Sequence, residues 1–447
     1  MTKERSWQND DLLAQTVRVK ECRSTKRIEA GKAAALGLAI FVILWLRRPD
    51  CLLNAQFWAE DGGLFFREQV LYGFWGSLAR SYAGYLHVIP RMVTAAICVL
   101  LPVRWVPLGC NACALLLEAV SCSAFFWPCY RKIIASDSLR AVCCLAMTAS
   151  VVAGSELIAT LSNVQWYLCI LSLLLIVDAP RVREIWLTVA QAAVALSAPV
   201  TLLYLPFLVW QLRTKARWPR LRPAIHIGAL LLQVWVMSQS TLEPKPVLRL
   251  NSLFLATLSS GLSRCVLAPL FGSAFLQEDT EISLLTKMAV AGILGVALAT
   301  LLAVRLRGLR RLHWLASGAY VGTGSLVAIL GGRGVAKSFL SLSGLRTYTA
   351  ERYFFVGACL FVFCVALAMD TFADRWKPGM AAALLAGAFA WGTLQNFSAR
   401  PFADLDWKTN AGKIERWDMA RKRHEKVETL TIPINPPNLV LVLDGSH

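Results

Sequence analysis

Apolar stretches of roughly 17 to 20 residues recur along most of this 447-residue chain. Each is long enough to cross a hydrocarbon core about 30 Å thick as an α-helix. Because unpaired backbone groups are costly in lipid, these stretches are predicted to be helices and not open strands. Only 17% of the residues are charged, whereas soluble domains carry roughly 25%. The sequence therefore predicts an all-α polytopic membrane protein.

The charge distribution narrows the class of partners. A formal net charge of +18 would suggest nucleic acid as the partner of a soluble protein. Here the basic residues gather in short segments between apolar stretches, such as residues 213–222 (RTKARWPRLR) and 305–311 (RLRGLRR). This is the positive-inside pattern, which orients a protein in the membrane. We therefore expect membrane lipids, and no nucleic acid, among the partners.

Three segments are expected along the chain. Residues 1–31 are polar and basic near the first apolar stretch, which places the N-terminus in the cytoplasm and the protein in the cell inner (plasma) membrane. Residues 32–395 are expected to hold about twelve spans, in the range of roughly 10 to 13. Residues 396–447 form a hydrophilic extracytoplasmic tail, with a charged helix around 408–428 and a short strand at 438–443. Outer loops with interfacial helices are expected at about 48–85, 241–284 and 331–352.

The expected topology contains one conflict. The positive-inside rule places the basic loops at 181–183, 213–222, 305–311 and 375–377 in the cytoplasm. Counting spans back from these loops then places Asn163 and the tail outside. Counting forward from the first helix places the basic turn at 130–140 (YRKIIASDSLR) outside as well, against the same rule. We therefore expect that one segment between Leu86 and Val164 is broken, re-entrant or not a span.

Two adjacent acids, Glu60 and Asp61, follow the first apolar stretch in the segment "NAQFWAEDGGLFF". The aromatic-rich run behind them suits a helix in the membrane interface, which would hold both acids near the outer headgroups. A carboxylate there could act as general base on a hydroxyl, or bind a divalent cation such as Mg²⁺ or Mn²⁺. The alternative is that the acids stabilise a helix N-terminus.

Other polar residues lie at the outer ends of expected spans. His87 and Arg91 are four residues apart in "YAGYLHVIPR" and share a helix face, where they could bind a phosphate or sugar or contact headgroups. Asn163, Gln165 and Trp166 in "LSNVQWYL" could bind sugar hydroxyls, or serve as a helix cap and an interfacial tryptophan. Lys337, Glu351 and Arg352 lie before a later span, where the cations suit a lipid-linked phosphate.

In combination, "WAEDG", "YAGYLHVIPR", "NVQW" and "ERYFF" resemble a bacterial branch of the GT-C class of integral-membrane glycosyltransferases. The resemblance covers the whole chain by architecture. It implies a GT-C-like fold and a polyprenyl-phosphate-linked sugar as donor at the outer face. The acceptor would be a lipid or a cell-envelope glycan, and the anomeric configuration would be inverted.

The resemblance also implies roles for individual residues. Asp61 would be the general base, and Glu60 its alternate or a metal ligand. Arg352, Arg91 and Lys337 would stabilise the departing lipid phosphate. A transporter or flippase of lipid-linked sugars is the alternative function. Transporters usually have repeated halves and polar breaks near the membrane midplane, whereas the polar candidates of this chain gather at the outer ends of helices.

Overall fold

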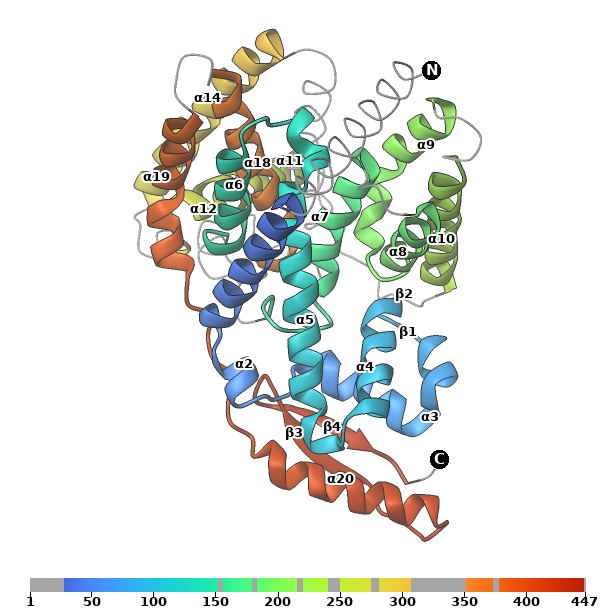
Figure 1. Ribbon diagram of the computed structural model, residues 1–447. Coiled ribbons are helices and arrows are strands. Elements are labelled where there is room, and N and C mark those ends of the chain that lie inside the picture. The colour runs from blue at the N-terminus through green and yellow to red at the C-terminus, as the bar shows by residue number, and fades with distance from the viewer. Residues whose placement is uncertain are drawn as a thin grey trace, which may run out of the picture.

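The computed structural model describes residues 28–151, 156–178, 183–214, 220–239, 250–274, 281–306, 351–372 and 378–445. In these ranges the chain is mainly helical, with two small two-stranded antiparallel sheets (Figure 1). The all-α membrane class predicted from the apolar stretches is therefore supported by the helices, while the number of spans differs from the prediction.

The main elements follow one another along the chain as a helical bundle with short helices at one end (Figure 1). The first half comprises the first helix (Ile28–Arg47), α2 (Asp50–Leu53), η1 (Asp61–Phe66), α3 (Arg67–Leu78), β1 (Ser81–Tyr82), β2 (Tyr85–Leu86), α4 (Val88–Leu100), η2 (Val103–Trp105), α5 (Val106–Ser123), α6 (Asp137–Ala149), α7 (Val164–Val177), α8 (Glu184–Ala195) and α9 (Leu205–Thr214). The second half comprises α10 (Leu221–Gln239), α11 (Leu250–Ser260), η7 (Gly261–Leu267), α12 (Ala268–Phe271), α14 (Glu281–Arg305), η8 (Glu351–Phe354), α18 (Phe355–Phe372), α19 (Pro378–Asn396), α20 (Trp407–Lys422), β3 (Leu430–Ile434) and β4 (Leu439–Leu443).

Within the described ranges, five helices are long and apolar enough to cross a membrane, or six if the bent pair α8–α9 is one span. The expectation of about twelve spans is therefore wrong for this part of the chain. Several apolar stretches form shorter helices: α4 has 13 residues and α7 has 14, so each rises only about 20 Å, less than the thickness of a core of about 30 Å. Residues 307–350, which fall within the range expected to hold the twelve spans, lie outside the described residues. The five helices are Ile28–Arg47, Val103–Lys132, Leu221–Gln239, Ser252–Phe271 and Glu351–Phe372.

Ion pairs and hydrogen bonds define the two ends of the bundle. At one end, which we call the basic end, Arg131 pairs with Glu29 and Lys132 Nζ lies 2.6 Å from Asp178 Oδ2. The turn after α5 therefore lies beside the start of the first helix and the end of α7. At the opposite end, the loop end, the Arg47 side chain donates to the carbonyls of Val151 and Asn396, so the ends of the first helix, α6 and α19 meet.

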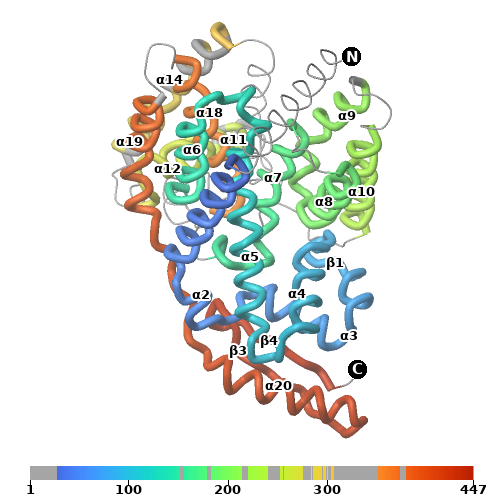
Figure 2. The backbone as a smooth tube through the Cα atoms, viewed as in Figure 1, coloured from blue at the N-terminus to red at the C-terminus, as the bar shows by residue number. Residues whose placement is uncertain are grey.

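The short helix α4 resolves the topological conflict in the sequence. The chain reaches the loop end after Arg47, and the basic turn at 130–132 lies at the basic end beside Glu29. Only α5 runs between these two points; it is the long helix that starts near the β3–β4 hairpin in Figure 2. The preceding α4 leads from the β1–β2 hairpin to η2, which packs against α20 in the tail. The segment that starts near Leu86 therefore does not run from one end of the bundle to the other.

The tail folds onto the first loop at the loop end (Figure 1). Phe57 packs against Phe66 and Trp407, with ring centroids 5.0 and 4.8 Å apart. Asn435, just after β3, donates its backbone N–H to Phe57 O at 3.0 Å and accepts from Ala59 N. The helix predicted in the tail is present as α20, and the strand predicted at 438–443 is present as β4. The tail therefore fixes the chain immediately before Glu60.

Candidate functional site

Asp61 is an anchor between the first loop and the turn before α7. Its side chain is 1% exposed. Oδ2 accepts the Leu161 backbone N–H at 2.8 Å, and Oδ1 accepts that of Ser162 at the same distance. Burial raises the pKa of Asp61 to about 7, although the two backbone donors oppose this shift. Both oxygens expected to act on substrate or a metal are thus engaged with the protein's own backbone.

Glu60, the other acid of the pair, is partly exposed and points to a different set of groups. The Tyr82 hydroxyl on β1 donates to Glu60 Oε1 at 3.4 Å. Burial raises the pKa of Glu156, and the negative charge of Glu60 raises it further, while Arg352 opposes the shift. Glu60 is therefore the acid of the pair that lies close to the residues expected to bind substrate.

We call the group around Glu60 the loop-end cluster. It draws on four chain segments: the first loop, the β1–β2 hairpin, the chain leading into α7, and η8 at the start of α18. Gln165 Nε2 donates to the Tyr85 hydroxyl at 3.1 Å, which ties α7 to the hairpin. The Trp166 and Tyr353 rings meet edge to face with centroids 5.5 Å apart, which ties α7 to η8. The members of the loop-end cluster are Glu60, Tyr82, Tyr85, Glu156, Gln165, Trp166, Arg352 and Tyr353.

Arg352 is the cation of this cluster. It forms an ion pair with Glu156, and its Nη2 donates to the Tyr353 hydroxyl at 3.3 Å. The Arg352 side chain is 32% exposed, against 18% for Glu156, so the guanidinium remains accessible from one side. Neighbouring Glu351 is turned away toward Arg264 on η7, with Oε1 3.5 Å from Nη1. Of the two adjacent predicted residues, Arg352 joins the cluster and Glu351 helps to attach η8 to η7.

His87 and Arg91 lie behind the cluster. The His87 ring is 3% exposed and packs on Tyr85 with centroids 4.2 Å apart. Burial lowers the pKa of His87 to about 3, with the Arg91 charge as the second cause. Arg91 itself is buried, pairs with Glu68 on α3 and donates to Ser77 Oγ at 3.1 Å. The arginine that was expected to bind a phosphate is thus already paired with a carboxylate of the first loop, Glu68.

Asn163 shapes the turn rather than capping the helix. Its side-chain nitrogen donates to Glu156 O at 2.9 Å and to Thr160 Oγ1 at 3.2 Å. No side-chain cap bond to α7 is present. By holding this turn, Asn163 supports both Glu156 and the N–H groups that bind Asp61. The predicted residue Lys337 lies outside the described residues.

Several members of the cluster were not among the residues predicted to bind substrate. Tyr82 and Tyr85 belong to the quoted segment "YAGYLHVIPR", but nothing in the sequence showed that a hairpin would turn them toward Glu60 and Gln165. Outside the cluster, Arg264, the partner of Glu351, was missed because it lies within an apolar helical stretch. A charged residue in such a stretch is itself a signal, because intramembrane charges are seldom retained without a partner.

The expected cation site has only one available carboxylate. Asp61 engages both oxygens with backbone N–H groups, which leaves Glu60 alone of the pair. Across the described part of the chain, no three His, Cys, Asp or Glu side chains are grouped so that they could hold a metal ion.

No protein-family model, curated protein or solved structure matches this chain.

Proposed function

We propose that the chain is a membrane glycosyltransferase that moves a sugar from a polyprenyl-phosphate donor to a cell-envelope glycan or lipid, with the loop-end cluster as its reacting site. One observation carries the proposal: the partly exposed Glu60 carboxylate, the accessible Arg352 guanidinium, and the Gln165 amide with the Trp166 ring come from three chain segments and meet at one end of the bundle, where the β1–β2 hairpin links them. The chemistry needs a base, a cation for the leaving phosphate and a surface for the sugar.

Glu60 takes the proton of the acceptor hydroxyl as it attacks the anomeric carbon from the face opposite the lipid phosphate, which inverts the configuration. Two observations support this role: the Glu60 side chain is partly exposed, and its hydrogen bond from the Tyr82 hydroxyl is long, at 3.4 Å. General base catalysis of this kind typically contributes about 10²–10⁴-fold. Asp61 holds the turn before α7 against η1 and so positions Glu60, because the two acids are consecutive in the chain.

Arg352 stabilises the lipid phosphate as the sugar leaves. In the donor-free protein its charge is matched by Glu156. A donor phosphate replaces that partner, and the guanidinium fork suits two phosphate oxygens at once. The raised pKa of Glu156 lets this carboxyl take up a proton more readily once Arg352 turns to the donor. Gln165 and Trp166 orient the sugar by an amide hydrogen bond and a ring face.

The proposal places the loop end outside the cytoplasm. Arg131, Lys132, Arg183 and Arg213 lie at or near the opposite end, in or beside the basic segments of the chain. Positive residues accumulate in cytoplasmic loops. The basic end therefore faces the cytoplasm, with the protein in an inner membrane. The donor and acceptor then reach Glu60 and Arg352 from the outer leaflet.

The test replaces Glu60 with Gln in a strain whose surface glycans are profiled by mass spectrometry. The control is Glu428→Gln, which removes an exposed carboxylate of the tail. We expect Glu60→Gln to remove one defined sugar while the protein keeps its normal level in the membrane, and Glu428→Gln to leave the profile intact. A profile that depends on the protein but tolerates Glu60→Gln would contradict the proposed base.

One observation favours transport of a lipid-linked sugar as a second candidate. The packed faces of α8 and α10 carry Gln191, His226 and Gln233, which are at most 1% exposed. Neither ring nitrogen of His226 has a hydrogen-bond partner within the described structure. Buried polar groups between membrane helices often mark a transport path. We call these three residues the α8–α10 seam.

A further inference from the structure

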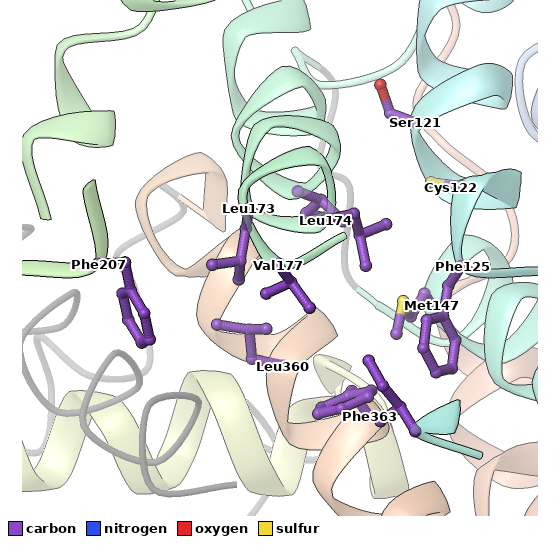
Figure 3. A pocket seen from close by; sticks show the side chains of 12 residues that line it. Ser121, Cys122, Phe125, Met147, Leu173, Leu174, Val177, Phe207, Leu360 and Phe363 are labelled. Atoms are coloured by element: carbon purple, nitrogen blue, oxygen red, sulfur yellow. The ribbon is translucent and has the colours of Figure 1, made fainter. Parts of the chain in front are cut away.

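The bundle contains an apolar cavity that belongs to neither polar region. It measures about 50 Å³ and lies among α5, α6, α7, α9 and α18. Figure 3 shows Leu173, Leu174 and Val177 of α7 between Phe207 on one side and Phe125 with Met147 on the other. Ser121, a rare polar lining residue, donates its hydroxyl to Leu117 O at 2.7 Å. The lining therefore offers almost no hydrogen bond to a ligand.

The apolar lining of this cavity favours a hydrocarbon as its ligand. About 10–15 Å³ suffices for one water molecule, but a water needs two to four polar partners and apolar cavities remain dry. An alkyl chain needs no such partners and replaces missing dispersion contacts of the walls. Four lining residues on α7 and α9, namely Leu173, Leu174, Val177 and Phe207, are only half-buried, so the cavity is not sealed on this side.

The basic end supplies a place for a charged headgroup. Ile133 and Val177 line the cavity, and their chain neighbours Lys132 and Asp178 form an ion pair at that end. The Lys132 side chain is 46% exposed. Arg213 is exposed and lies six residues beyond Phe207 on α9, about 9 Å along the helix. Cations near a membrane surface attract anionic lipids.

We propose that this cavity binds a short segment of an acyl chain of an anionic phospholipid whose headgroup lies at the basic end, beside Lys132 and Arg213. The cavity is lined by residues 170–177 of α7, nearer the basic end, whereas the loop-end cluster uses Gln165 and Trp166 at the start of this helix. The proposal does not depend on the proposed glycosyl transfer. Its occupant would brace α7, which carries Gln165 and Trp166 at its other end, against α5 and α18.

The test uses the full-length chain in nanodiscs with phosphatidylglycerol that carries a photoreactive diazirine in one acyl chain. Peptide mapping is expected to place cross-links on α7 and on the segment around Met147. Val177→Trp fills the cavity from its half-buried side and should reduce these cross-links about tenfold, the equivalent of about 1.4 kcal/mol of binding. Leu231→Trp, on the exposed face of α10, is the control and should leave them unchanged.

A double variant at the basic end and competition with unlabelled lipids test the headgroup and the occupant separately. Lys132→Gln with Arg213→Gln should weaken the cross-links without altering the cavity walls, so a folding defect in Val177→Trp would not decide the result. Unlabelled phosphatidylglycerol should compete, and phosphatidylcholine should not. Cross-links spread over exposed helix faces and insensitive to all variants would overturn the site. Competition by a polyprenyl phosphate but not by phosphatidylglycerol would overturn the phospholipid as its occupant.

Discussion

The loop-end cluster and the α8–α10 seam are both buried polar regions of a largely apolar molecule, but they are built differently. The cluster joins four chain segments through Glu60, Tyr85, Gln165 and Arg352 and keeps a carboxylate and a guanidinium partly exposed. The seam joins two neighbouring helices and is closed. Polar residues between packed helices also act as structural links in membranes. The difference favours the loop-end cluster over the seam as the proposed reacting site, because the cluster is both more exposed and supplied by more chain segments.

The largest effect after the loss of Glu60 is expected at Arg352. Arg352→Gln removes the charge that faces the leaving phosphate, and loss of one such group typically costs about 10²–10³-fold in kcat. Arg352→Lys keeps the charge without the planar fork, so its rate should fall between the two. Transfer rates in purified membranes measure this order. Arg400→Gln, which removes an exposed arginine near the same end, should behave like wild type.

A smaller effect is expected at Trp166. Its indole nitrogen is buried and has no acceptor within the described structure, which is consistent with a place for a sugar hydroxyl. Trp166→Phe keeps a ring but removes the donor, so KM should rise about two- to tenfold while kcat changes less. Trp391→Phe on the exposed face of α19 is the control. An unchanged KM would show that the indole N–H of Trp166 does not bind the sugar.

The anchor role of Asp61 predicts a pH-dependent stability. Its pKa is about 7 in the folded protein against an ordinary value of 3.8. Between these values the folded chain binds more protons than the unfolded chain, so the free energy of unfolding falls as the pH rises from about 4 to 7. Thermal unfolding in detergent across this range should show the decline in wild type.

Asp61→Asn removes this titration and leaves one backbone N–H unpaired, which should lower stability by about 1–3 kcal/mol at acidic pH. The pH dependence of its unfolding midpoint should be correspondingly flatter. An unaltered pH profile in the variant would show that Asp61 is not the group responsible.

The smallest effect is expected from the seam. Gln191→Leu with His226→Leu replaces two buried polar side chains by apolar ones, which is often nearly neutral. If the cluster alone performs the reaction, glycosyl transfer should change less than about twofold. A transporter would instead lose movement of the lipid-linked sugar between leaflets. Both quantities are measured on the same proteoliposomes.

The sequence predicted the helical class and singled out Glu60, Gln165, Trp166 and Arg352, which the structure brings together in the loop-end cluster, because polar groups at the ends of apolar stretches are visible without coordinates. It could not predict which acid of the adjacent pair is buried, since consecutive residues differ only in the direction of their side chains. The pairing of Arg91 with Glu68 depends on how α3 folds back against α4. Likewise, the apolar composition of α4 resembles a span, and only its length and its neighbours show otherwise.

Cleavage of the sugar–phosphate bond is the most direct test of the central claim. The full-length protein is reconstituted in liposomes with a lipid extract of the parent strain and its membrane acceptor fraction, and polyprenyl phosphate is quantified by mass spectrometry. Wild type is expected to release polyprenyl phosphate, and Glu60→Gln to do so about 10²–10⁴-fold more slowly. Intact lipid-linked sugar that merely changes leaflet, at the same rate in both proteins, would contradict it.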